Sequence, residues 1–151
     1  MDTSISISDN TIKIEPYFQQ IYEYAKKIHE TLGSGYKEHI YVTALNIHLN
    51  KNSILFNNEV IIPILYENIQ LGYERADTII YKPYECILEF KAQNTKLSSK
   101  EIIQLRKYLR NYDNNKIKTG ILLNFNSSLE CIIVTENSHY NLHLSDIKGA
   151  L

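Results

Sequence analysis

The sequence predicts one layered α/β (α+β) domain in which helices flank a central mixed β-sheet. The expected elements follow the order helix, helix, strand, strand, strand, helix, strand, strand, so a crossover helix separates a meander from a further strand. A chain of 151 residues with 44% hydrophobic content can bury one core but not two. We therefore treat residues 1–151 as a single domain. Residues 1–14 are either a short edge strand or a disordered arm, and 137–151 form a tail without assigned structure.

Two helices are expected in the first third of the chain. The first begins at Pro16, which the first turn tolerates, and ends at Gly33-Ser34-Gly35. Its apolar stripe has three-and-four spacing: Phe18, Ile21, Ala25, Ile28 and Leu32. The second helix runs from about Lys37 to Leu49, and its buried face consists of Tyr41, Leu45 and Leu49. Glu38 falls on the same row, and because burial of an unpaired carboxylate is costly, this position calls for a specific role.

Three strands and a helix are expected next. Segments 59–66 and 70–81 read as two Ile- and Tyr-rich strands joined by a tight turn at Glu67-Asn68. Pro63 indicates that the first is an edge strand or carries a bulge. A third strand covers 84–91. The helix covers 98–111, with a Ser98-x-x-Glu101 capping box and the apolar row Ile102, Leu105, Leu109 and Tyr112.

Two further strands, at 118–125 and 129–135, complete the expected sheet. Cys86 and Cys131 are the two cysteines, and each lies inside an apolar run, so we expect reduced core thiols rather than a disulfide framework or a zinc site. The chain shows neither a signal peptide nor an apolar run long enough to span a bilayer. We expect a soluble, unexported protein of the cytoplasm or another reducing intracellular compartment, without membrane contact.

The formal net charge of -1 argues against a general polyanion binder, because such proteins carry a surplus of Lys and Arg. Nucleic acid is still allowed, since carboxylates that hold a divalent cation offset basic residues elsewhere. The most basic segment of the chain contains Lys96, Lys100, Arg106, Lys107 and Arg110. On a helix these residues are ordinarily a solvated face, and a neighbouring phosphate-binding site would make them candidate phosphate contacts.

The chemistry-bearing residues lie on the second and third expected strands. Alternate strand residues share a face, so Glu89 and Lys91 point the same way, and an antiparallel neighbour would bring Asp77 alongside them. Hard cations such as Mg²⁺ prefer oxygen ligands, here Asp77, Glu89 and the backbone carbonyl of Phe90. Lys91 would orient a water or stabilise charge on phosphorus. In isolation, Glu-x-Lys on a strand is more often a solvated surface pair.

The neighbouring motifs add specificity. The segments are Gly35-Tyr36-Lys37-Glu38-His39-Ile40-Tyr41, Glu59-Val60 with Pro63, Leu71 to Asp77, Leu88 to Ala92, Gln104 to Leu109, and Gly120 to Phe125. In this order they resemble the GxxExxY family of the PD-(D/E)XK nuclease superfamily, over about residues 20–126. The resemblance implies a nuclease core with a mixed sheet, and a Mg²⁺ or Mn²⁺ site at Asp77 and Glu89.

The resemblance also implies roles for residues outside the strands. Glu38 would join or support the metal site as the helix carboxylate, and Gln104 with Tyr108 is similar to the Gln-x-x-x-Tyr element of the exonuclease branch. Residues four apart share a helix face, which agrees with this reading. The chain departs from the family pattern at Glu74, which adds negative charge near the site, and at Phe90, where the family favours Leu or Val. Metal selectivity is the property that these departures affect.

The leading hypothesis is a Mg²⁺- or Mn²⁺-dependent endo- or exodeoxyribonuclease. Asp77, Glu89 and the Phe90 carbonyl would hold the metal, Lys91 would assist the water, and Glu38 and Gln104 would support them. The nucleic-acid contacts would come from Arg75, Tyr108, Lys100, Arg106 and Lys107, with Arg75 alternatively pairing with Glu74 or Glu85. A non-catalytic nucleic-acid- or protein-binding module on the same fold is the alternative. A carboxylate-pair glycoside hydrolase leaves Lys91 without a role. The sequence leaves a homodimer or a protein partner open.

Overall fold

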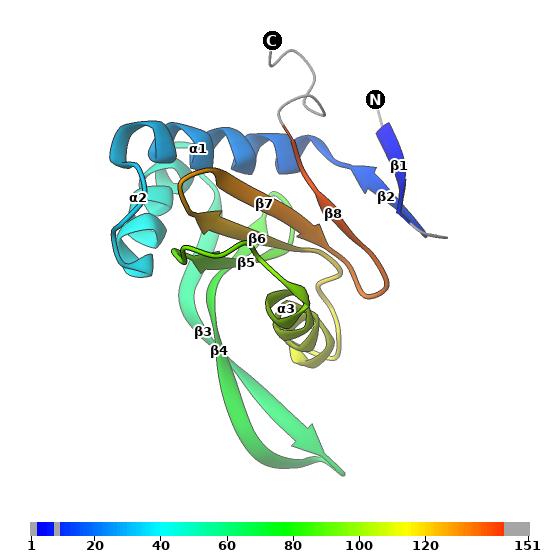
Figure 1. The fold of residues 1–151 in the computed structure, drawn as a ribbon. Coiled ribbons are helices and arrows are strands. Elements are labelled where there is room, and N and C mark those ends of the chain that lie inside the picture. The colour runs from blue at the N-terminus through cyan, green and yellow to red at the C-terminus, as the bar shows by residue number, and fades with distance from the viewer. Residues whose placement is uncertain (1–2, 8–9, 144–151) are drawn as a thin grey trace.

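A six-stranded mixed sheet with helices on both faces forms the body of the protein (Figure 1). The computed structural model describes residues 3–7 and 10–143. The spatial order of the strands follows the chain: β3 (Leu55–Tyr66), β4 (Ile69–Lys82), β5 (Cys86–Lys91), β6 (Gly120–Phe125), β7 (Leu129–Val134) and β8 (His139–Asn141). The β5–β6 pair is parallel and the others are antiparallel. The sheet therefore contains both parallel and antiparallel pairs, which confirms the predicted mixed sheet. A crossover helix connects the two parallel strands.

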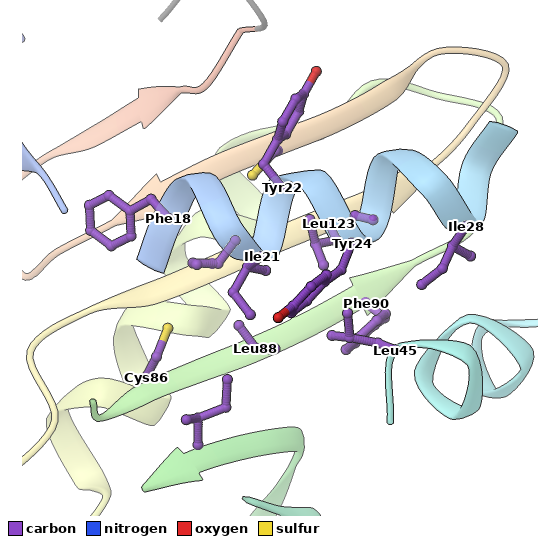
Figure 2. Close-up of a cluster of buried hydrophobic side chains, with 14 of the residues drawn as sticks. Phe18, Ile21, Tyr22, Tyr24, Ile28, Leu45, Cys86, Leu88, Phe90 and Leu123 are labelled. Atoms are coloured by element: carbon purple, nitrogen blue, oxygen red, sulfur yellow. The ribbon is translucent and has the colours of Figure 1, made fainter. Parts of the chain in front are cut away.

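The helices cover the two faces of the sheet unequally. α1 (Pro16–Leu32) and α2 (Glu38–Lys51) pack on one face, and α3 (Ser99–Asn111) packs on the other. Figure 2 shows the α1–α2 side, where Ile21 and Leu45 meet Leu88 and Phe90 of β5. On the α3 side, Leu105 belongs to a second buried cluster with Ile87 of β5 and Leu122 of β6. The alternation therefore turns Leu88 and Phe90 toward α1 and α2, and leaves Glu89 and Lys91 on the α3 side.

Sequence periodicity predicted the helices well. The stripe of α1 is buried apart from partly buried Leu32, and Tyr41, Leu45 and Leu49 of α2 are buried. Gly33 ends α1 with φ of 70°, a conformation that glycine adopts without strain. The capping box of α3 is present, with the Ser98 backbone N–H donating to Glu101 Oε1 at 2.6 Å. Both cysteines are free and buried, as expected.

Both ends of the chain contain strands that the sequence pattern did not assign. β1 (Thr3–Ile7) and β2 (Asn10–Ile14) pair as a separate antiparallel hairpin instead of joining the edge of the main sheet. In the expected tail, β8 pairs with β7 and Leu142 is buried. Residues 1–2, 8–9 and 144–151, which belong to the same two expected regions, lie outside the described residues.

A long β3–β4 hairpin projects from the body (Figure 1). We call residues 60–76 the arm. β3 is an edge strand with a register shift between Ile64 and Leu65, as Pro63 indicated, and Glu67 and Asn68 have the positive φ values of a tight hairpin turn. β4 pairs with β5 only from Thr78 to Ile80, so the arm is a two-stranded ribbon beyond that point. Both strands are longer than predicted, and β3 gains its extra residues 55–58 at the end that pairs with Thr78–Lys82 in the body of the sheet.

Candidate active site at the divergence of β4 and β5

The candidate site forms where β4 and β5 part. The last backbone pair is Thr78 with Leu88, and the register places Asp77 opposite Glu89 at the next step. At this step, hydrogen bonds between side chains and the backbone take the place of backbone pairing. Asp77 Oδ2 accepts the Phe90 backbone N–H at 2.8 Å, and Glu89 Oε1 accepts the Asp77 backbone N–H at 3.0 Å. Each carboxylate is thus fixed by the backbone of the neighbouring strand, and the two predicted ligands do lie side by side.

Burial and mutual proximity perturb this carboxylate pair. Desolvation raises the pKa of Glu89 to about 8, and the neighbouring Asp77 charge acts in the same direction. Burial likewise raises the pKa of Asp77, against the opposing effect of the Phe90 hydrogen bond. The two carboxyl groups are close enough to hydrogen bond to each other when one is protonated. Such a pair either shares a proton or binds a cation, and carboxylates with raised pKa values concentrate at functional sites.

Lys91 lies beside both carboxylates, two positions after Glu89 on the same face of β5. Its positive charge lowers the pKa of Asp77 and of Glu89, although burial outweighs it at both. The same ammonium group also acts on Glu101 of α3. The spacing therefore correctly predicted that an acid pair and an amine share one location.

The predicted Gln104–Tyr108 pair forms on the inner side of α3. Gln104 Nε2 donates to the Tyr108 hydroxyl at 3.1 Å, and Tyr108 is buried. Burial raises the pKa of Tyr108, and the charges of Glu89, Glu74 and Asp77 add to this effect. The hydroxyl is therefore close to the carboxylate pair, where it stays protonated.

Glu38 approaches the site from α2, but not from a buried row. Its side chain is exposed because it occupies the first turn of α2, one turn before the buried stripe. The expectation that Glu38 lies among core residues is therefore wrong. It nevertheless lines, together with Asp77, a hollow between α2 and the strands that we call the α2 hollow.

The tyrosine at the end of the Gly35 to Tyr41 motif fixes the start of α2. The Tyr41 hydroxyl donates to the Gly33 carbonyl at 2.7 Å and accepts the Tyr36 backbone N–H at 3.2 Å. Its ring stacks on Phe125, with centroids 4.2 Å apart. Tyr41 thereby ties the loop between α1 and α2 to the sheet and sets where Glu38 enters the α2 hollow.

The donor set suits one divalent cation. Asp77 Oδ2 and Glu89 Oε1 are used by backbone N–H groups, and the adjacent pair retains further carboxylate oxygens, which hard cations prefer. Among the described residues, no three His, Cys, Asp or Glu side chains converge closely enough to hold a metal. Glu38 would therefore act from outside the immediate ligands. Phe90 contributes its N–H to Asp77, while its carbonyl as a ligand stays a prediction.

The basic residues that we predicted to contact nucleic acid lie in different parts of the structure. Lys100 and Lys107 of α3 line a second hollow with Gln104, which we call the α3 hollow, across from Glu74 of the arm. Arg106 instead donates from Nε to the Thr135 carbonyl at 3.0 Å, which directs it toward the end of β7. Arg75 pairs with Glu59 at 3.7 Å, and not with Glu74 or Glu85.

Two residues near Asp77 were not assigned to the candidate site from the sequence. Glu59 lies opposite Asp77 in the register, lines the α2 hollow and has φ of 49°, a left-handed conformation that is strained for a non-glycine residue. Asn58 donates to Thr78 Oγ1 at 3.0 Å and exchanges amide hydrogen bonds with Asn46 of α2. The matching Glu59-Val60 segment was visible in the sequence, but its closeness to Asp77 depends on the strand register.

Comparison with known proteins supports the fold. A model of the PD-(D/E)XK nuclease superfamily matches residues 15–134. The solved crystal structure of SSO0001 is similar in fold, with a TM-score of 0.51 and 19% identity, over 78% of this chain and 62% of that one. This chain thus spans less than two thirds of that protein. No curated protein sequence matches.

The fold and site define a nuclease-like α+β domain. The chain belongs to the PD-(D/E)XK nuclease superfamily. In the described part of the chain, no helix combines the length and the hydropathy that crossing a bilayer requires.

Proposed function

We propose that the protein is a Mg²⁺- or Mn²⁺-dependent phosphodiesterase that hydrolyses nucleic acid, with DNA as the expected substrate, and that it belongs to the GxxExxY group within its superfamily. One observation carries this proposal. Asp77 and Glu89 lie side by side, each held by the backbone of the opposite strand, with Lys91 on the same face. Burial of two adjacent carboxylates is unfavourable without a proton or a cation between them, and hydrolysis of a phosphodiester commonly uses such a cation.

The residues of this chain would divide the work as follows. Asp77 and Glu89 hold the cation, and when bound it neutralises phosphate charge and makes water a better nucleophile. Lys91 places its ammonium group beside the carboxylates, where it can hold the attacking water or stabilise charge that builds on the phosphate oxygens. Gln104 and Tyr108 fix the α3 side of the site, and Glu38 reaches it from the α2 hollow.

The test is cleavage of labelled single-stranded DNA, duplex DNA, branched DNA and RNA in Mg²⁺, in Mn²⁺ and in EDTA. The parent protein should cut at least one substrate only with a divalent cation. Glu89→Gln should lose this activity by at least about 100-fold, since removing one group that stabilises developing charge costs that much in other hydrolases. The Gln side chain retains the oxygen that accepts the Asp77 N–H, so the strands stay in place.

Lys27→Ala is the matched control, because Lys27 is exposed on α1, away from the site. It should cleave as the parent does. Equal cleavage by Glu89→Gln and the parent would overturn the assignment. Absence of cutting on every substrate would favour the alternative of a non-catalytic binding module.

A further inference from the structure

The α3 hollow is shaped by one stripe of α3 and one residue of the arm. Lys100, Ile103, Gln104 and Lys107 lie at three-and-four spacing on the same helix face, and Glu74 of β4 faces them. Its volume of about 530 Å³ falls within the range of ligand-binding pockets. Ile103 is half exposed between the two lysines, so the surface offers cations with an apolar contact between them.

The α3 hollow shares one residue with the surroundings of the carboxylate pair. Gln104 belongs both to its lining and to the hydrogen bond with Tyr108, whose hydroxyl lies near Glu89. The Gln104–Tyr108 pair therefore connects the α3 hollow to the site. The seven-residue separation of Lys100 and Lys107 corresponds to about 10 Å along the helix, at 1.5 Å per residue.

The two sides of the strands differ in charge. The α2 hollow contains the carboxylates of Glu38, Glu59 and Asp77, and none of the described residues that line it is Lys or Arg. The α3 hollow contains two ammonium groups against the single carboxylate of Glu74. Arg75 offsets the charge of Glu59, which leaves the α2 hollow acidic. In the absence of a bound cation, a polyanionic backbone is therefore attracted to the α3 side and repelled from the α2 side.

We propose that the α3 hollow binds one single strand of nucleic acid and leads it to the carboxylate pair. Lys100 and Lys107 contact its phosphates, Ile103 contacts a sugar or a base, and Glu74 weakens the binding by repulsion. This inference rests on the proposed function, because it names the substrate class of that site. A duplex fits less well, since its second backbone would meet the acidic side of the strands.

The experiment measures the anisotropy of a fluorescent oligonucleotide, as single-stranded DNA, single-stranded RNA and duplex DNA, in EDTA at several KCl concentrations. Without a divalent cation, binding is measured independently of cleavage. Both single strands should bind more tightly than the duplex, and their comparison shows whether the sugar matters. Lys100→Ala and Lys107→Ala should each weaken binding and reduce the salt dependence, by about 0.7 in the slope of log K against log salt concentration.

One further variant should change the binding affinity in the opposite direction, and another serves as the control. Glu74→Gln should tighten binding, because it removes the one negative charge in the hollow. Lys27→Ala removes the same charge from α1 and should bind as the parent does. Thermal unfolding of each variant verifies that it is folded, and all of these side chains except half-buried Glu74 are exposed.

The outcomes separate the two proposals. The proposed binding of a single strand in the α3 hollow is overturned if neither Lys100→Ala nor Lys107→Ala changes binding, or if duplex DNA binds more tightly. This holds even if the protein cleaves nucleic acid. If binding depends on the two lysines but the protein cleaves none of the substrates, the proposed binding in the α3 hollow is supported and the proposed nuclease activity is overturned.

Discussion

Asp77 and Glu89 combine a structural role with their proposed role as cation ligands. One oxygen of each closes the sheet where the backbone ladder stops, at 2.8 and 3.0 Å from an N–H group of the other strand. Replacement by alanine would therefore remove both the ligand and a strand contact. Amide variants are more informative, because Asn and Gln retain the accepting oxygen.

The pH dependence of stability should report on Glu89 in the metal-free protein. Its folded-state pKa is raised to about 8, so between the unfolded value and that pH the folded state holds a proton that the unfolded state has lost. The free energy of unfolding must then fall as pH rises through this window, because the unfolded state binds fewer protons. Glu89→Gln has no such proton. We expect its thermal midpoint in EDTA to exceed that of the parent increasingly from about pH 5 to pH 8.

Circular dichroism melts across that range provide the measurement. A difference between the two proteins that does not change with pH would contradict the raised pKa of Glu89. Lys27→Ala serves again as the control, and its midpoint should follow that of the parent.

Residue spacing predicted which side chains meet at the candidate site but not their surroundings. Asp77, Glu89 and Lys91 were identifiable because strand alternation and one antiparallel connection suffice to bring them together. Glu59 and Asn58 were not, because their closeness to Asp77 depends on a register that the sequence does not display. Arg106 was grouped with Lys100 and Lys107 from sequence proximity, although a helix turns them to different contacts.

At the level of elements, α3 is held against the sheet by a close contact with β6. A Cβ atom added to Gly120 would lie 2.7 to 2.9 Å from three atoms of Leu105, which is fully buried. Gly120→Ala must therefore displace the Leu105 side chain, and we expect α3 to move with it, together with Gln104 and Tyr108. We expect a loss of stability of about 1–3 kcal/mol, as for other overpacked cores.

Denaturant unfolding measures that loss, and cleavage by the folded fraction tests the consequence for the site. If α3 positions the site, activity should fall more than the folded fraction does. Gly72→Ala is the matched control, since a Cβ atom there has no neighbour within 4 Å and the position lies in the exposed arm.

Helices were easier to predict than strands for a physical reason. The buried stripes of α1, α2 and α3 recur with the period of the helix, so burial and local geometry agree. The arm breaks this agreement, since it extends beyond the core and exposes large apolar side chains: Leu65, Tyr66, Ile69, Leu71 and Tyr73. β8 has only three residues, too few for a recognisable alternation.

For the whole molecule, a divalent cation should act as a stabilising ligand. The proposed site forms only when β4 and β5 are paired, so a cation binds the folded state in preference to the unfolded chain. At a concentration 100 times its dissociation constant, the expected stabilisation is about 2.7 kcal/mol. In a domain of this size, each kcal/mol raises the thermal midpoint by about 2–4 °C.

Melting curves in Mn²⁺, in Mg²⁺ and in EDTA measure this stabilisation. The midpoint of the parent should rise with cation concentration, whereas Asp77→Asn and Glu89→Gln should respond weakly. A rise of equal size in all three proteins would locate the cation elsewhere on the molecule.

The early end of the β4–β5 ladder gives the outer part of the arm, beyond the buried residues Ile62 and Ala76, an independence that is useful in protein engineering. Residues 60–76 share no backbone ladder with β5, and the turn at Glu67-Asn68 lies far along the chain from Asp77. The hairpin tip could therefore be shortened, lengthened or exchanged for a recognition loop without cutting through the sheet that holds the carboxylates. The same framework could in this way carry different target preferences while its chemical centre stays unchanged.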